Sequence, residues 1–278
     1  MAPELLNPSH MRSWLAAVVI AGGCAFTPGI QDDTGGSGQR GGGSGSGSGG
    51  SGTTTPPSCE VDDPTGLELC LDFNSPATLG TDSGPDHNDA TVANVVPMTR
   101  AQDPAAQYTS SSTTRVAESP SIDVPTDGAF SIETWVDLAE LPADGTPYEV
   151  ISHPQYSIEV HHDGAVRCTI GSYYADSDDT DILGIQIGTG TWTHVGCTYD
   201  ASTQTVAVWL DGSPANCYQL GGDERWNAPS PGTAGVTVGE PFVGGIDNVH
   251  VLGRTIGATE MCELAGKTKC NAGCPDGD

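Results

Sequence analysis

Short apolar runs that alternate with polar residues, each closed by Gly, Pro, Asp or Asn, recur along the chain from Cys59 to Thr255. A period of two residues is typical of half-buried β-strands, and these turn-forming residues commonly end them. Only residues 259–267 have the pattern of a helix. The sequence therefore predicts an all-β fold, an antiparallel sandwich with one short C-terminal helix. The expected strands cover residues 67–73, 130–136, 156–161, 165–170, 192–200, 205–210, 236–239 and 246–252.

The faces of these strands follow from the alternation. In residues 130–136, Phe130 and Ile132 share one face, and Glu133 and Trp135 share the other. Asp163-Gly164 separates two alternating runs, which predicts a tight hairpin. The tryptophans that lie on expected strands are assigned to the core: Trp135, Trp192 and Trp209.

Several of these runs carry motifs of a known family. They are F-S-I-E-T-W-V at 130–136, W-T-H-V-G-C-T-Y-D at 192–200, V-W-L-D-G at 208–212 and G-I-D-N-V at 245–249, preceded by an acidic segment at 72–91. In this order they resemble laminin-G-like domains of the concanavalin-A-like lectins and glucanases, and also pentraxins. The resemblance implies a jelly-roll β-sandwich for residues 58–274. It is weaker evidence for function, because one fold serves many ligands.

The charge of the chain limits its partners. It has 36 Asp and Glu against 9 Lys and Arg, which gives a net charge of -27. Nucleic acid and bare anionic membrane are excluded as partners, because no basic patch exists to neutralise phosphate. Calcium, cationic surfaces and neutral sugars remain possible.

The N-terminal region predicts export. A basic segment at residues 11–13 precedes an apolar run at residues 14–21, which is too short to span a bilayer. Gly22-Gly23-Cys24 then resembles a bacterial lipobox, which implies lipidation of Cys24 and, with Ala25 following, outer-membrane sorting. The alternative is ordinary signal-peptide cleavage with Cys24 as a spare thiol. We expect a signal segment at 1–24, a flexible Gly/Ser-rich linker at 25–57 and a cell-surface domain whose only membrane contact is its lipid anchor.

The chain contains nine cysteines, which favour an oxidising compartment. Without Cys24, eight remain, enough for four disulfides. Cys168 and Cys197 both lie in the middle of strands that could be neighbours, so we predict that they pair. Only Cys270 and Cys274 have a spacing near that of a zinc site, which gives zinc little support.

Calcium is the metal that the sequence favours most. Asp247 interrupts the apolar closing strand, and Asp72 lies on the opening strand. The first and last strands of this architecture are usually neighbours, so the two carboxylates could meet at a structural calcium ion. In related sandwich families, the residue that matches Asp247 is often a calcium ligand. Asp82 lies in an acidic loop that could add ligands. The alternative is that Asp247 accepts hydrogen bonds from the backbone.

The candidate ligand-binding residues are aromatic. Tyr173 and Tyr174 precede an acidic loop at 176–181, and such a combination suits sugars. Trp226 lies outside any strand pattern and either binds ligand or covers the core. Neither Glu-x-Asp-x-Glu nor Glu-x-Asp-x-x-Glu, the carboxylate patterns of sandwich glycosidases, is present, and no other catalytic motif is found.

We therefore predict a non-catalytic module that binds carbohydrate or glycoprotein. One alternative is a structural module of the cell envelope that binds a protein partner. Another is an atypical glycosidase.

Overall fold

The computed structural model describes Cys59 and residues 63–75, 77–178, 184–221, 226–227 and 229–274. The expected signal segment, Cys24 and the linker lie outside the described residues. Among the described residues, no helix is long and apolar enough to cross a membrane.

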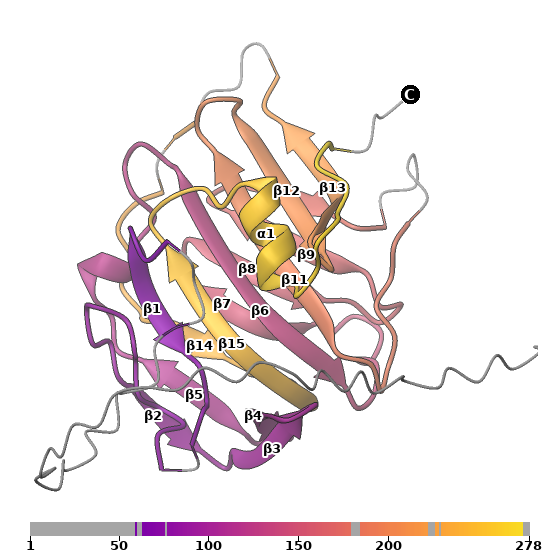
Figure 1. The fold of residues 1–278 in the computed structure, drawn as a ribbon. Coiled ribbons are helices and arrows are strands. Elements are labelled where there is room, and N and C mark those ends of the chain that lie inside the picture. Colours follow the sequence, from indigo (N-terminus) through magenta and orange to yellow (C-terminus); the bar gives the residue numbers. More distant parts are fainter. Residues whose placement is uncertain are drawn as a thin grey trace, which may run out of the picture. The chain divides into compact units, whose positions relative to one another are not determined.

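The described residues form two antiparallel sheets, which we call sheet A and sheet B (Figure 1). In sheet A the strand order is β13-β12-β11-β6-β15-β4-β3, with β1 also paired to β15. Its strands are β1 (Leu67–Leu71), β3 (Val96–Arg100), β4 (Asp103–Tyr108), β6 (Phe130–Leu138), β11 (Thr193–Asp200), β12 (Thr205–Leu210), β13 (Ser213–Gln219) and β15 (Gly244–Leu252).

In sheet B the order is β10-β9-β8-β7-β14-β5-β2. Its strands are β2 (Ala90–Ala93), β5 (Thr113–Val116), β7 (Tyr148–His153), β8 (Tyr156–Val160), β9 (Val166–Ile170), β10 (Tyr173–Asp176) and β14 (Thr237–Val238). A 3-10 turn, η1 (Pro120–Ile122), and the helix α1 (Ala258–Leu264) complete the elements. The predicted β-sandwich with a short C-terminal helix is confirmed.

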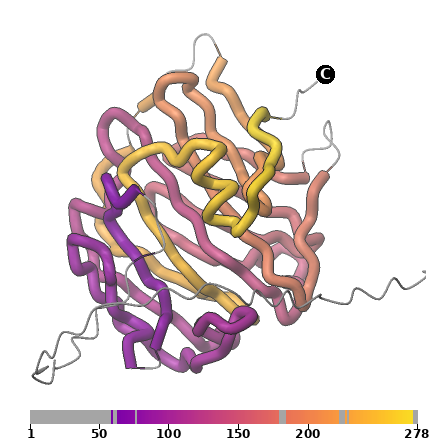
Figure 2. The backbone as a smooth tube through the Cα atoms, in the orientation of Figure 1, coloured from indigo at the N-terminus to yellow at the C-terminus, as the bar shows by residue number. Residues whose placement is uncertain are grey.

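The first and last strands are neighbours, as the architecture implied. Leu71 of β1 lies opposite Val249 of β15 in an antiparallel pair. Figure 2 shows the indigo and yellow ends of the colour scale side by side, although they are far apart in the sequence. The hairpin at Asp163-Gly164 is also confirmed: β8 and β9 are antiparallel, and Gly164 adopts a φ of 89°, which favours glycine.

The main hydrophobic core contains side chains from both sheets. Ile132 and Val136 of β6 belong to it, together with Ile158 of β8 and Val251 of β15. These residues come from strands whose alternate positions face the opposite sheet, as the sequence pattern predicts.

The other face of sheet A is covered as well. Trp209, Leu252 and Met261 belong to a second cluster beneath α1. A Cβ atom on Gly196 of β11 would lie 2.8 Å from the Met261 side chain, so α1 packs closely over this strand. This outer cluster buries positions that a one-sided sheet would leave in water.

The tryptophan assignment was wrong for two residues. Trp135 and Trp192 are only half-buried and belong to neither hydrophobic cluster. Trp135 shares the outer face of β6 with Glu133, so it cannot reach the core between the sheets. Trp209 is buried, but in the outer cluster.

Four disulfides link the described cysteines, and the predicted bridge between Cys168 and Cys197 is one of them. It joins β9 of sheet B to β11 of sheet A through the middle of the core. The others are Cys59–Cys70, Cys217–Cys274 and Cys262–Cys270.

Candidate functional site

A pocket of about 370 Å³ lies between the edge strand β10 of sheet B and the edge strand β13 of sheet A. Three tyrosines dominate its lining. The full lining is Ser172, Tyr173, Tyr174, Ala175, Asp176, Asn216, Cys217 and Tyr218.

The two edge strands are held together at this pocket. The Asn216 side chain donates a hydrogen bond to the backbone carbonyl of Asp176, with an N–O distance of 2.7 Å. The neighbouring strands β9 and β11 are linked by the Cys168–Cys197 bridge. The pocket is therefore built on cross-linked strands, which favours a preformed site.

Two of the three tyrosines are exposed to solvent. Tyr174 is 56% exposed and Tyr218 is 38% exposed, while Tyr173 is half-buried. The rings of Tyr173 and Tyr218 stack with centroids 6.4 Å apart. Arg167 lies over the Tyr174 ring at 5.0 Å and also pairs with Asp176, at an N–O distance of 2.8 Å. Exposed tyrosine rings beside carboxylate and amide groups are suited to sugars.

The structure brings together Tyr173 and Tyr174, which the sequence predicted, and adds Tyr218, which it missed. The sequence feature that could have revealed Tyr218 is the run at residues 213–219, which follows Asp211-Gly212. That dipeptide is a hairpin turn, and the next run forms β13, so its alternate side chains Asn216 and Tyr218 share a face.

Trp226 covers the core, which is the second of the two roles that the sequence allowed. Its ring stacks on Tyr199 with centroids 4.1 Å apart, and it packs against the main core. It also lies 6.2 Å from Tyr173, so it supports the pocket from behind and is not part of the lining. A Cβ atom at Gly128 would lie 2.5 Å from the indole, so glycine is needed beneath it.

Carboxyl groups cluster beside the pocket. Burial raises the pKa of Asp178 to about 6, and the charges and hydrogen bonds of Asp176 and Asp163 add to the rise. At mildly acidic pH, Asp178 is therefore largely protonated. The acidic loop at 176–181 continues into residues 179–183, which lie outside the described part.

A second acidic group lies near β1. Burial, followed by the hydrogen bond and the charge of Asp86, raises the pKa of Glu68 to about 7. The folded state therefore holds this proton more tightly than an unfolded chain does.

Glu68 and Asp178 contribute stability that should be lost as the pH rises from about 4 to about 7. Their raised pKa values mean that the stabilisation is complete below the unfolded-state values and is lost on deprotonation. Unfolding in urea from pH 4.5 to 8 should give a falling midpoint. The double variant Glu68→Gln/Asp178→Asn should reduce the dependence of the urea midpoint on pH. A wild-type midpoint that rises between pH 5 and 7 would contradict the prediction.

The three residues predicted to bind calcium do not form one cluster. Among the described residues, no group of three His, Cys, Asp or Glu ligand atoms within 4.8 Å of one another includes Asp72, Asp82 or Asp247. Asp82 instead organises its loop: it accepts hydrogen bonds from the backbone N–H groups of Cys70, Gly84 and Asn88. These donors occupy most of its lone pairs.

Asp247 also has protein partners. Its carboxylate pairs with Arg100, with an N–O distance of 2.8 Å, and accepts a hydrogen bond from the backbone N–H of Asn248. Arg100 in turn lies over the Trp135 ring at 4.5 Å. These contacts offset the free-energy cost of burying the Asp247 carboxylate, a role that the sequence analysis gave to a metal ion. Asp72 accepts hydrogen bonds from Asn74 and Ser83. Calcium binding stays a prediction.

A buried triad of one carboxyl group and two imidazoles lies on the outer face of sheet A. Glu133 of β6 accepts a hydrogen bond from His194 of β11, at 2.6 Å, and contacts the Nδ1 atom of His250 of β15. All three side chains are at most 1% exposed. Burial opposes ionisation of Glu133, but the two histidines outweigh it and lower its pKa to about 2.

The comparisons with known proteins agree with this architecture. Residues 110–262 match the Laminin_G_3 family model, described as the concanavalin A-like lectin/glucanases superfamily. The chain therefore belongs to this superfamily, and the resemblance stated from its sequence motifs is confirmed. No curated protein sequence matches the chain.

Solved structures share the fold at low identity. One is domain 4 of AbnA, a GH43 extracellular arabinanase from Geobacillus stearothermophilus, in complex with arabinotriose: 17% identity, TM-score 0.55, covering 72% of this chain and 98% of that one. The binding domain of Paraclostridial Mosquitocidal Protein 1 has 14% identity and a TM-score of 0.57, covering 72% and 52%. The binding domain of botulinum neurotoxin serotype D has 13% identity and a TM-score of 0.55, covering 73% and 52%. At these identities, the likeness shows the fold alone.

Proposed function

We propose that this domain is a non-catalytic recognition module that binds carbohydrate or the glycan of a glycoprotein in the pocket between β10 and β13. The observation that carries the proposal is the set of three tyrosines around that pocket, two of them exposed. Superfamily membership supports it, and so does the presence of an arabinotriose complex and of toxin binding domains among the structures with this fold.

The proposed ligand is uncharged. The chain carries a net charge of -27, which repels acidic polysaccharides. A sugar ring can stack on an exposed tyrosine without any charge, and its hydroxyls can bond to the polar groups beside the ring. The four disulfides fit an exported protein. We further propose that Cys24 carries the lipid that holds the domain at the outer membrane or cell surface.

Removal of the exposed rings tests the site. Tyr174→Ala and Tyr218→Ala should each lower glycan affinity about tenfold, equivalent to about 1.4 kcal/mol, because each removes a stacking surface. The ligand would be found with a glycan array, and its affinity measured by calorimetry on the full chain. Leu141→Ala is the control, because Leu141 is an exposed apolar side chain outside the pocket.

Unchanged affinity in both tyrosine variants, with unchanged thermal unfolding, would place binding elsewhere. If the array finds no glycan, the recognition proposal fails.

One observation favours the glycosidase alternative. Asp178 has a raised pKa and lies beside Asp176, which lines the pocket. The carboxyl groups that act as general acids in glycosidases have raised pKa values of this kind. However, the two carboxyls are in hydrogen-bond contact, closer than the roughly 5 Å that a retaining mechanism needs. Release of reducing sugar that Asp178→Asn abolishes would favour the enzyme over the recognition module.

A further inference from the structure

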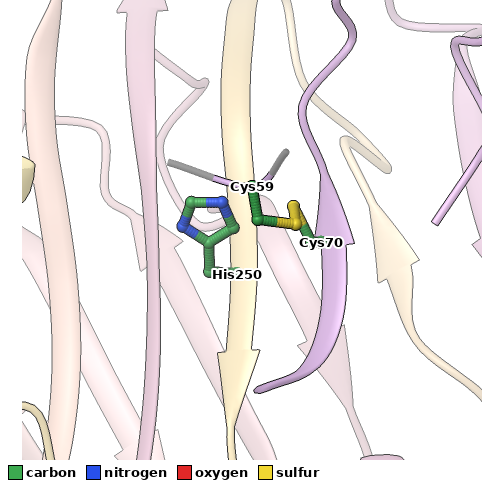
Figure 3. Close-up of side chains that lie close together, drawn as sticks. All are labelled: Cys59, Cys70 and His250. Carbon is green, nitrogen blue, oxygen red and sulfur yellow. A yellow bond between two sulfur atoms is a disulfide. The ribbon is translucent and has the colours of Figure 1, made fainter. Parts of the chain in front are cut away.

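The Cys59–Cys70 disulfide lies beside His250 on sheet A (Figure 3). The two Sγ atoms and a ring nitrogen of His250 all lie within 4.8 Å of one another. Among the residues that the structure describes, these are the only three His, Cys, Asp or Glu side chains grouped so closely. The sheet itself fixes this arrangement, because Cys70 and His250 are cross-strand partners on β1 and β15.

His250 is also oriented as a ligand would be. Its Nδ1 atom faces the Glu133 carboxylate, and Glu133 is held from the other side by His194. Figure 3 shows the second ring nitrogen on the side of Cys59. Histidines that bind metals commonly donate their other N–H to a carboxylate, which fixes the tautomer and the ring orientation.

We propose that the reduced form of this protein binds a zinc ion through Cys59, Cys70 and His250, with Glu133 as the carboxylate that positions His250. A dithiol or phosphine supplies the two electrons that break the S–S bond, and two protons complete the thiols. Both thiols lose these protons when the two sulfur–zinc bonds and the one nitrogen–zinc bond form. A water molecule occupies the fourth position, an arrangement that Cys₂His sites adopt.

The backbone already has the necessary spacing. The Cα atoms of Cys59 and Cys70 are 6.2 Å apart. Two thiolates on a tetrahedral zinc ion lie about 3.8 Å apart, so side-chain rotation suffices to open the bridge around the ion. Cys70 and His250 are buried, whereas Cys59 is half-buried and gives access for the reductant and the ion. Thiolate and imidazole ligands select zinc over calcium.

The experiment uses the full chain, reduced with a phosphine under argon and titrated with Co²⁺ as a spectroscopic substitute for zinc. Alkylation and peptide mass analysis would first verify that Cys59 and Cys70 are free. We expect one Co²⁺ per chain, with thiolate charge-transfer and tetrahedral d–d bands that zinc abolishes. The oxidised protein should show neither.

Variants separate this site from the other cysteines. His250→Gln and, should that variant not fold, Cys59→Ser/Cys70→Ser should remove the bands. Cys262→Ser/Cys270→Ser, which deletes a different bridge, should leave them unchanged. Glu133→Gln should weaken Co²⁺ binding about 10- to 100-fold.

Three results would overturn the proposal. One is reduced protein that binds no Co²⁺, and another is full binding by Cys59→Ser/Cys70→Ser. The third is a Cys59–Cys70 bridge that stays closed in the folded protein in excess phosphine.

Discussion

Glu133→Ala is expected to lower the free energy of unfolding by about 3–5 kcal/mol, because it removes the carboxylate from a buried polar network and leaves the other members in place. The variant leaves His194 and His250 inside the protein without the carboxylate that both contact. Neither imidazole can reach water instead, since both side chains are at most 1% exposed. Urea unfolding at pH 7 measures the loss.

Glu118→Ala is the control for this prediction. Glu118 is exposed, and its removal should change stability by no more than about 0.5 kcal/mol. Equal stability of the two variants would show that the triad contributes nothing. At low pH the difference should shrink: the depressed pKa of Glu133 means that its contribution is present above about 4.5 and is lost as the pH falls towards about 2.

The double variant Cys168→Ala/Cys197→Ala is expected to lose about 2–5 kcal/mol of unfolding free energy. This bridge spans 29 residues of sequence and joins the two sheets through the core, so its loss frees the unfolded chain and removes a buried contact. Thermal and urea unfolding of the oxidised proteins would measure the effect.

The Cys262–Cys270 bridge provides the matched comparison for this prediction. It spans only 8 residues, so Cys262→Ala/Cys270→Ala should cost about 1 kcal/mol less in chain entropy. If both deletions have the same effect, loop length does not set the contribution of these bridges.

The fold was predictable wherever strands alternate strongly. The run at 205–210 coincides with β12, and those at 130–136 and 192–200 match β6 and β11 to within two residues. The strands that were missed are β2, β3, β4, β5, β7, β10 and β13. Of these, β2, β3 and β4 contain few large apolar residues and lie towards the sheet edges. Edge strands are partly solvated, so they need no clear apolar alternation.

The site was predictable only in part, for a related reason. Tyr173 and Tyr174 were recognisable beside an acidic loop, but Tyr218 comes from the other sheet. The alternation of residues within a strand does not show which strands lie next to each other. The triad was hidden as well. Glu133 looked isolated on its strand, because the partners that justify its burial lie 61 and 117 residues further along the chain.

The disulfides near the two ends of the domain determine how it would respond to mechanical force. Tension applied through the chain before Cys59 would enter sheet A at Cys70, bypassing the residues between them, and tension applied beyond Cys274 would enter at Cys217 of β13. Between these two points lie β1, β15, β6, β11, β12 and β13, all in sheet A. The pull would thus cross one sheet from strand to strand, while sheet B, which supplies β10 to the pocket, would stay outside the path of the force.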